Sequence, residues 1–325
     1  MGLVGSVRSL HRYPVKSMVG ESLDVTTVSR AGVPGDRAWA VRNLDVGEQQ
    51  GARKIPALLG LVATTVATDE PAPNAPPMIR FPDGEEWSAD DPRASEQVSA
   101  YVGKRVELVP LAPASHLAHY RQAHLATDGA ELWKEMGVGA GEDAPDMSSL
   151  PLKKLAQLGV FVTPPGTYFD AYPLHILTTS SLRFVGQQLD GAPVDPCRYR
   201  PNLVIDSGEM EGLVEADWEG VSLEVGGCRF HVDAATVRCS IPGRAQAIEG
   251  IGADKQVVRA VAQHAARHLG VYASVTQPGS IRVGDPVHLI PRRNRPVAGA
   301  LRRAERSLTR SILRRVLGAP VDRDS

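Results

Sequence analysis

Cysteine is scarce in this sequence, with three in 325 residues: Cys197, Cys228 and Cys239. They form no repeated C-x-x-C pattern, and three thiols cannot all pair, so no disulfide framework is expected. This usage fits a reducing compartment, and we expect the chain to be cytoplasmic. The count also excludes an iron–sulfur cluster held by four cysteines.

Long apolar runs and an excess of one charge are absent as well. No run of about eighteen apolar residues could span a bilayer, and the amino terminus lacks the charged start and apolar stretch of a signal peptide. The formal net charge is −1, so the chain as a whole has no electrostatic reason to bind nucleic acid or a membrane.

Several signature motifs are missing too. The sequence contains no G-x-x-x-x-G-K-[ST], no G-x-G-x-x-G after a strand, no H-E-x-x-H and no G-x-S-x-G. Nucleotide-driven phosphoryl transfer, dinucleotide binding, zinc proteolysis and α/β-hydrolase chemistry therefore lose support.

The patterns that are present are mostly those of strands. Residues 3–18 alternate apolar and polar side chains, and residues 198–207, 220–236 and 280–290 are strand-like segments separated by glycines. We therefore predict a mainly β fold with some helices (α+β), in which an amino-terminal β-barrel-like domain precedes a second β-barrel domain.

We predict four parts along the chain and two clear helices. The parts are a β-rich domain, a linker with short helices, a second β domain and a basic tail, at residues 1–110, 111–168, 169–291 and 292–325. Helices are expected over residues 94–103 and, with an apolar face, over residues 254–270. A third is expected to begin at the Thr-Thr-Ser stretch that precedes Leu182.

Cys239 stands in TVRCSIPGRAQ, behind Arg238 and ahead of a turn-forming Ser-Ile-Pro-Gly stretch. A thiol becomes a good nucleophile or metal ligand as the thiolate, which nearby positive charge favours. Sulfur is a soft donor, suited to a soft metal centre. The residues alone leave two interpretations open: a metal-binding thiolate, or a buried and inert small side chain.

Cationic residues recur beside turns in the strand-rich segments. They are Lys16, Arg37, Arg198, Arg200 and Arg238. An isolated arginine is usually a surface charge, but a barrel could bring these five together. Arginine forks match phosphate oxygens and lysine supplies a point charge, so such a group would bind an anionic ligand that bears phosphate.

Several ordered segments resemble the MOSC family of molybdenum-cofactor proteins, in the branch of the mitochondrial amidoxime-reducing component and its bacterial relatives. LHRYPVKSMVGESLDVTTVSRAGVPGDRAWAV is similar to the amino-terminal β-barrel domain of that family. The blocks similar to the MOSC domain proper are DAYPLHILTTSSL, RYRPNLVID, VRC and GVYASVTQPGSIRVGDPVHL.

The resemblance implies a molybdenum cofactor (molybdenum bound to molybdopterin) and a set of site residues. Cys239 corresponds to the molybdenum ligand, and Asp170 to an acid near the metal, for which a proton-handling role is a hypothesis. The residues that correspond to cofactor contacts are Lys16, Ser17, Arg37, Thr179, Ser180, Arg200, Asn202, Arg238 and Cys239. The loop after Cys239, SIPGRAQAIEG, and Val237 before Arg238 depart from the family pattern, which leaves the substrate open.

The function implied is that of a molybdenum-cofactor oxidoreductase that reduces N-hydroxylated or N-oxide compounds. Its electrons would come from a separate ferredoxin, flavodoxin or flavin or haem reductase, because the cysteine count leaves no room for a fused ferredoxin domain. The alternative is a non-catalytic module that carries or delivers the cofactor or its sulfur.

The carboxy-terminal residues 291–325 contain ten arginines and three acidic residues. Apolar side chains fall along one stripe of a helix there, so residues 292–325 are predicted to form a basic amphipathic tail. It could contact a membrane surface peripherally or dock an acidic electron donor, or it could be a solvated extension.

Overall fold

The computed structural model describes most of the chain. The described residues are 2–66, 72, 74–123, 133–134, 136–139, 142, 144–290, 306–311 and 313. Most of the predicted basic tail, namely residues 292–305, 312 and 314–325, lies outside them. No helix among the described residues is long and apolar enough to cross a membrane.

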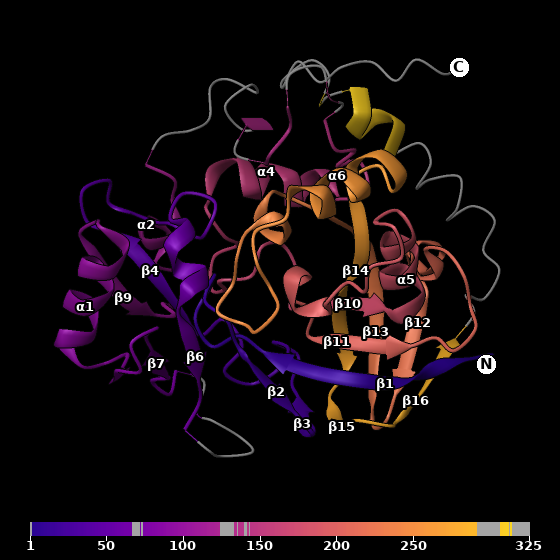
Figure 1. The fold of residues 1–325 in the computed structure, drawn as a ribbon, viewed down its shortest axis with the longest axis horizontal. Coiled ribbons are helices and arrows are strands. Elements are labelled where there is room, and N and C mark those ends of the chain that lie inside the picture. Colours follow the sequence, from indigo (N-terminus) through magenta and orange to yellow (C-terminus); the bar gives the residue numbers. More distant parts are fainter. Residues whose placement is uncertain are drawn as a thin grey trace.

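Seven strands of the described structure close into a barrel (Figure 1). Within the described residues its strands, in order around the ring, are β1 (Gly2–Arg12), β16 (Pro286–Ile290), β12 (Ser222–Val225), β13 (Cys228–Val237), β14 (His268–Gln277), β10 (Leu174–Thr178) and β11 (Leu203–Asp206). All neighbouring pairs are antiparallel except β10 and β11, which are parallel.

The barrel core follows the strand period. Along β13, buried and partly exposed residues alternate without a break, because successive side chains point to opposite faces of a strand. Phe230 and Val232 point into the core, where both are fully buried, while His231 and Asp233 lie on the outer face. The predicted mainly β fold with some helices is confirmed.

The first strand, β1, pairs with two strands from the carboxy-terminal half of the chain. β1 pairs with β11 through Leu10 and Leu203, and with β16 through Gly2 and Leu289. Figure 1 shows β1 running along the barrel from the end marked N toward the amino-terminal unit. The predicted domain boundary at residue 110 stays a prediction. The first strand of the predicted amino-terminal domain, β1, is also one of the strands of the carboxy-terminal barrel.

Smaller sheets build the amino-terminal unit. β2 (Glu21–Leu23) extends the barrel sheet beside β1, and β3 (Val25–Val28) pairs with β15 (Gly279–Arg282). The other strands form two three-stranded sheets: β5 (Glu48–Gln49), β4 (Trp39–Asn43) and β9 (Val106–Pro110), and β6 (Val62–Thr64), β7 (Met78–Arg80) and β8 (Glu86–Ser88). Their apolar faces share a second core with the helix α1 (Pro92–Val102).

The other helices include α2 (Leu117–Tyr120), α4 (Leu152–Val160), α5 (Thr179–Gln187) and α6 (Lys255–His264). Helices α5 and α6 pack against side chains of β10 and β11, where Leu177 and Val204 join their apolar side chains in one cluster. The predicted helix over residues 254–270 is too long, because Ala266 and Arg267 adopt left-handed backbone with φ of 45° and 62°. The chain turns there, and β14 begins at His268.

Candidate functional site

The end of β13 brings Cys239 to a cavity between the barrel and the amino-terminal unit. β13 ends at Val237, and the next two residues, Arg238 and Cys239, leave the sheet before a short turn of 3-10 helix at Ile241–Gly243. The cavity has a volume of about 70 Å³. Its lining residues include Arg37, Asp170, Arg198, Tyr199, Arg200, Asn202, Thr236, Arg238, Cys239 and Tyr272.

The three thiols have different surroundings. All are free. Cys228 is fully buried in the barrel core, and burial raises its pKa to about 11. Cys197 is half-buried beside Asp195, and burial together with that carboxylate raises its pKa to about 12. Cys239 is the thiol among the lining residues, so it is the one that a ligand in the cavity can reach.

Two of the lining arginines are fixed by backbone carbonyls. Arg238 donates from both terminal nitrogens to the carbonyl of Tyr199, at 3.2 and 3.1 Å. Arg198 donates to the carbonyls of Pro242 and Gly252, at 3.2 and 3.0 Å. Arg198 therefore holds the loop after Cys239 in place, and both cations are buried beside the thiol.

Arg37 and Arg200 stack on one aromatic ring. The guanidinium carbons of Arg37 and Arg200 lie 5.0 and 4.3 Å from the centre of the Tyr13 ring. Arg37 also pairs with the buried carboxylate of Asp36, and its side chain reaches the carbonyl of Arg200 at 3.4 Å. Burial, together with the charge of Arg37, lowers the pKa of Arg200 to about 10. Two buried like charges this close favour an anionic partner.

Strained backbone gathers at the same place. Ser17, Arg37 and Arg200 all adopt left-handed backbone, with φ of 74°, 49° and 56°. Such a conformation is uncommon for residues other than glycine and persists only where the surroundings impose it. The neighbouring Gly51 is required by packing, since a Cβ there would lie 2.6 Å from the Ser17 hydroxyl. That hydroxyl accepts a hydrogen bond from the backbone nitrogen of Ala52 at 2.8 Å.

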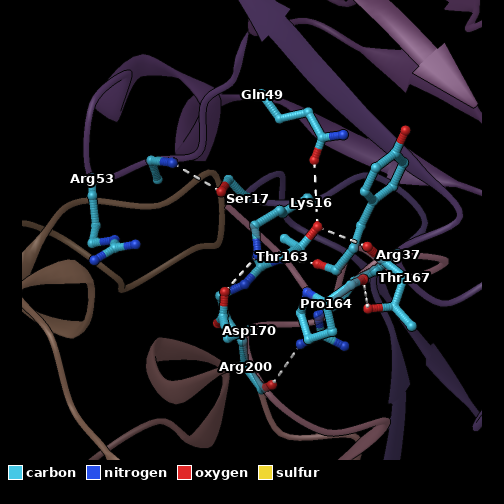
Figure 2. A network of polar contacts seen from close by, with 12 residues as sticks. Lys16, Ser17, Arg37, Gln49, Arg53, Thr163, Pro164, Thr167, Asp170 and Arg200 are labelled. Atoms are coloured by element: carbon cyan, nitrogen blue, oxygen red, sulfur yellow. Dashed lines mark hydrogen bonds and ion pairs between the residues drawn. The ribbon is translucent and has the colours of Figure 1, made fainter. Parts of the chain in front are cut away.

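Lys16 and Asp170 form an ion pair at the mouth of the cavity. Lys16 Nζ donates to Asp170 Oδ1 at 2.5 Å and to the carbonyl of Tyr168 at 3.0 Å. Figure 2 shows Lys16 pointing toward Asp170, with Arg53 to one side. Desolvation would raise the pKa of Asp170, but the Lys16 ammonium and nearby arginines hold it well below its usual value. Asp170 is therefore a carboxylate at neutral pH, and the proton of the pair resides on Lys16.

Buried hydrogen bonds fix the segment that carries Asp170. Thr163, which is fully buried, donates to the carbonyl of Thr167 at 2.8 Å and lies 3.5 Å from Gln49 of β5. The hydroxyl of Tyr168 donates to the carbonyl of Pro110 at 2.8 Å. These contacts join the segment to the amino-terminal sheet, as Figure 2 shows for Thr163 and Gln49.

Asn202 lies between the two halves of the site. Its side-chain oxygen accepts from the backbone nitrogen of His175 at 3.2 Å, and its amide donates to the carbonyl of His11 at 3.3 Å. Of the predicted site residues, those in the cavity lining are Arg37, Asp170, Arg200, Asn202, Arg238 and Cys239, with Lys16 paired to Asp170. Ser17 lies next to Lys16 and supports the loop.

Thr179 and Ser180 are placed differently. They begin α5, and Thr179 and Ser180 bond to the Ser207 hydroxyl at 3.2 and 2.9 Å. The buried carboxylate of Glu215 accepts from Thr178 and Ser181, both at 2.6 Å. Protein groups thus occupy this helix terminus, and Thr179 and Ser180 are not among the lining residues. Their role as cofactor contacts stays a prediction.

Several buried polar atoms around the cavity have no hydrogen-bond partner among the described residues. They are Tyr199 Oη, Arg200 Nη2, Thr236 Oγ1 and Arg238 Nε. An unpaired buried donor costs about 1–3 kcal/mol, and more when it is charged. Donors of this kind, in a cavity with four arginines, suit a ligand that carries anionic oxygens.

Two family models match the chain. The model of the MOSC domain matches residues 164–288, and the model of the MOSC N-terminal beta barrel domain matches residues 4–91. The chain belongs to the MOSC family. The MOSC-domain match contains Cys239 together with Arg198, Arg200 and Arg238. The N-terminal match contains Lys16, Ser17 and Arg37. The candidate site therefore combines residues from both matched regions.

Several solved structures match this chain at low similarity. The YUAD protein of Bacillus subtilis is 13% identical, with a TM-score of 0.39, over 88% of this chain and 94% of that one. YiiM of Geobacillus stearothermophilus is 20% identical, with a TM-score of 0.28, over 37% of this chain and 55% of that one. YiiM of Escherichia coli is 15% identical, with a TM-score of 0.29, over 38% and 57%. A search of the curated proteins found no match.

Sequence reasoning missed the aromatic part of this MOSC site. Tyr13 stacks on two arginines, and Tyr172, Tyr199 and Tyr272 line the cavity. The position of Tyr13, three residues before Lys16, was visible in the Y-P-V-K-S motif. The other tyrosines carry no local signal, because an isolated tyrosine is usually part of a core.

Proposed function

We propose that this chain is a molybdenum-cofactor-dependent oxidoreductase that reduces N-hydroxylated or N-oxide compounds. The observation that carries the proposal is the cavity in which the accessible thiol of Cys239 lies among Arg37, Arg198, Arg200 and Arg238. A sulfur donor beside a cationic pocket suits a cofactor that holds its metal through sulfur and ends in a phosphate.

The donor set supports a cofactor better than a bare metal ion. Among the described residues no three His, Cys, Asp or Glu side chains are grouped to hold a metal. A metal bound to Cys239 would therefore need its other ligands from a cofactor, and a dithiolene would supply them. The unpaired donors of Arg200 and Arg238 would face the cofactor's anionic oxygens.

The cofactor, when bound, would supply the two-electron chemistry that removes oxygen from nitrogen. Cys239 would hold the metal, and Arg200, Arg238 and Asn202 would orient the cofactor and neutralise its charge. Each turnover needs two electrons and two protons, and it releases the amine or amidine and water. The burial of the arginines keeps water away from these contacts and strengthens them.

Protons would pass through the Lys16–Asp170 pair. Desolvation lowers the pKa of Lys16, which the charge of Asp170 partly restores, so its ammonium can release a proton more readily than a lysine in water. Asp170, with 72% of its side chain exposed, would connect that ammonium to solvent. Asp170 would thus relay a proton rather than serve as the acid itself.

The test combines metal analysis with turnover on one preparation. Full-length protein is purified from a host that makes the cofactor, and amidoxime reduction is measured with an artificial electron donor. We expect near-stoichiometric molybdenum and turnover in the wild type, and loss of both in Cys239→Ala. Cys228→Ala, which removes the thiol buried in the barrel core, is the matched control and should keep both.

Molybdenum-free wild type, or full activity in Cys239→Ala, would refute the proposal. Retained cofactor with no turnover of any N-hydroxylated or N-oxide compound would instead favour a carrier module. In the enzyme, electrons would come from a separate donor protein, and the donor is identified by comparing rates with ferredoxin, flavodoxin and flavin or haem reductases.

A further inference from the structure

A second cavity lies on the outer face of the barrel, next to the candidate active site. It has a volume of about 190 Å³. Its lining residues are Ser148, Ser149, Leu150, Pro151, Tyr172, Glu219, His231, Asp233 and Arg306. Tyr172 lines both this cavity and that of Cys239, so the two share a wall.

Two carboxylates give this cavity an anionic character. Asp233 points outward from β13 and accepts from the Ser274 hydroxyl at 2.6 Å. It has no ion-pair partner within 4.0 Å in the part of the chain that the structure describes, and burial raises its pKa. Glu219, with 17% of its side chain exposed, is the second acid. The charges of the nearby His231 and Lys154 offset the raised pKa of Asp233 only in part, and a half-buried carboxylate that lacks a direct ion pair favours a cationic ligand.

The chain's own tail places a cation in this cavity. Residues 306–311 are helical and appear in yellow on the same side of the molecule as α6 (Figure 1). The guanidinium of Arg306 lines the cavity and pairs with Glu219. One turn later, Arg310 pairs with Asp146 at 2.7 Å and bonds to Ser148 at 3.2 Å, which fixes the helix over the cavity.

The aromatic wall suits a flat cation. Lys154 Nζ lies 4.8 Å from the centre of the Tyr172 ring, so this ring already faces one positive charge. Guanidinium and amidinium groups are planar, stack on aromatic rings and match carboxylates with paired N–H groups. Arg306 shows that such a group fits beside Glu219.

We propose that this cavity is a binding site for a guanidinium or amidinium compound, with Glu219 and Asp233 as counter-ions, and that Arg306 is its intramolecular occupant. An external cation and the tail would then compete for the same carboxylates. The site uses no group of the Cys239 cavity except the ring of Tyr172, so it goes beyond the proposed redox function.

The test uses methylguanidine as the probe and methylurea, its neutral analogue, as the ligand control. Dissociation constants are measured by NMR titration of the full-length protein without cofactor. We expect Arg306→Ala and Arg306→Gln to bind methylguanidine at least tenfold more tightly than the wild type. Arg105→Ala, which removes an exposed arginine paired with Asp45, should behave as the wild type.

Adding Glu219→Gln or Asp233→Asn to Arg306→Ala should weaken methylguanidine binding at least tenfold, and methylurea should not bind to any variant. Thermal unfolding of each variant checks that it folds. Equal affinity of the wild type and both Arg306 variants would overturn the proposal. So would affinity unchanged by both carboxylate substitutions, or equal binding of methylurea. Because the titration needs no molybdenum, these outcomes are independent of the proposed enzymatic function.

Discussion

The guanidinium carbon of Arg200 lies 4.3 Å from the centre of the Tyr13 ring. The same ring faces Arg37 at 5.0 Å, so one buried tyrosine of the amino-terminal unit holds two cations of the site. The hydroxyl of Tyr13 has no partner among the described side chains and backbone groups. The ring, rather than the hydroxyl, is therefore what positions the arginines.

Two substitutions of Tyr13 distinguish the contribution of its ring from that of its hydroxyl. Tyr13→Phe keeps the stacked ring, so we expect its free energy of unfolding to stay within about 0.5 kcal/mol of the wild type. Tyr13→Leu removes two cation–π contacts worth about 0.5–2 kcal/mol each, so it should be clearly less stable. Denaturant unfolding measures both. Equal losses in the two variants would mean that the ring has no special role.

An inorganic anion should stabilise the cofactor-free protein through Arg200. Its pKa is lowered to about 10 because burial and Arg37 disfavour its charge, and at neutral pH a bound anion would relieve that cost. We expect pyrophosphate to raise the melting temperature of the wild type, compared with chloride at equal ionic strength. Arg200→Met should lose at least half of the increase, whereas the surface variant Arg105→Met should keep it.

Glu215 should make stability fall as pH rises. Burial raises its pKa above the usual value, although the hydroxyls of Ser181 and Thr178 partly offset this. The folded state thus binds the Glu215 proton more tightly than the unfolded state does. The resulting stabilisation is complete below about pH 4, the unfolded pKa, and is lost as pH rises through the folded pKa.

Glu215→Gln removes that dependence. We expect the stability of the variant, relative to the wild type, to increase between about pH 4 and pH 7. Chemical denaturation at several pH values measures the difference. If the free energy of unfolding of the variant followed pH in parallel with that of the wild type, Glu215 would have the same pKa in the folded and unfolded states.

Phe230 tests the barrel core. It is fully buried at the centre of the β13 pattern, so Phe230→Ala should lower the free energy of unfolding by about 3–5 kcal/mol. His231→Ala, on the outer face of the same strand, is the matched control and should cost much less. Similar losses at the two positions would contradict the inward and outward assignment.

The parts of the fold that follow a local period could be predicted from the sequence. The alternation over Cys228–Val237 indicates a strand with one buried face, and Asp91 with Gly103 marks the ends of α1. The end of α6 could not be read in this way. Residues 254–270 keep a helical pattern of apolar side chains, and the left-handed turn at Ala266 and Arg267 depends on tertiary packing.

The candidate site, like the fold, could be predicted only in part from the sequence. Cationic residues beside turns could be recognised one by one, and the structure brings Arg37, Arg200 and Arg238 to the cavity of Cys239. Contacts between distant segments carry no local signal. The pairing of Arg306 with Glu219 is an example, since the two residues belong to separate elements and neither sits in a motif.

The position of β1 between β11 and β16 has a consequence for biosynthesis. Among the described residues, the first strand of the sequence is hydrogen-bonded to the last, so the ring cannot close until Ile290 has been synthesised. Until then the nascent chain exposes unsatisfied strand edges, which invite aggregation or chaperone binding. Closure between segments so far apart in the sequence predicts slow refolding. A recombinant fragment that lacks β1 would leave β11 and β16 as unpaired, aggregation-prone strand edges.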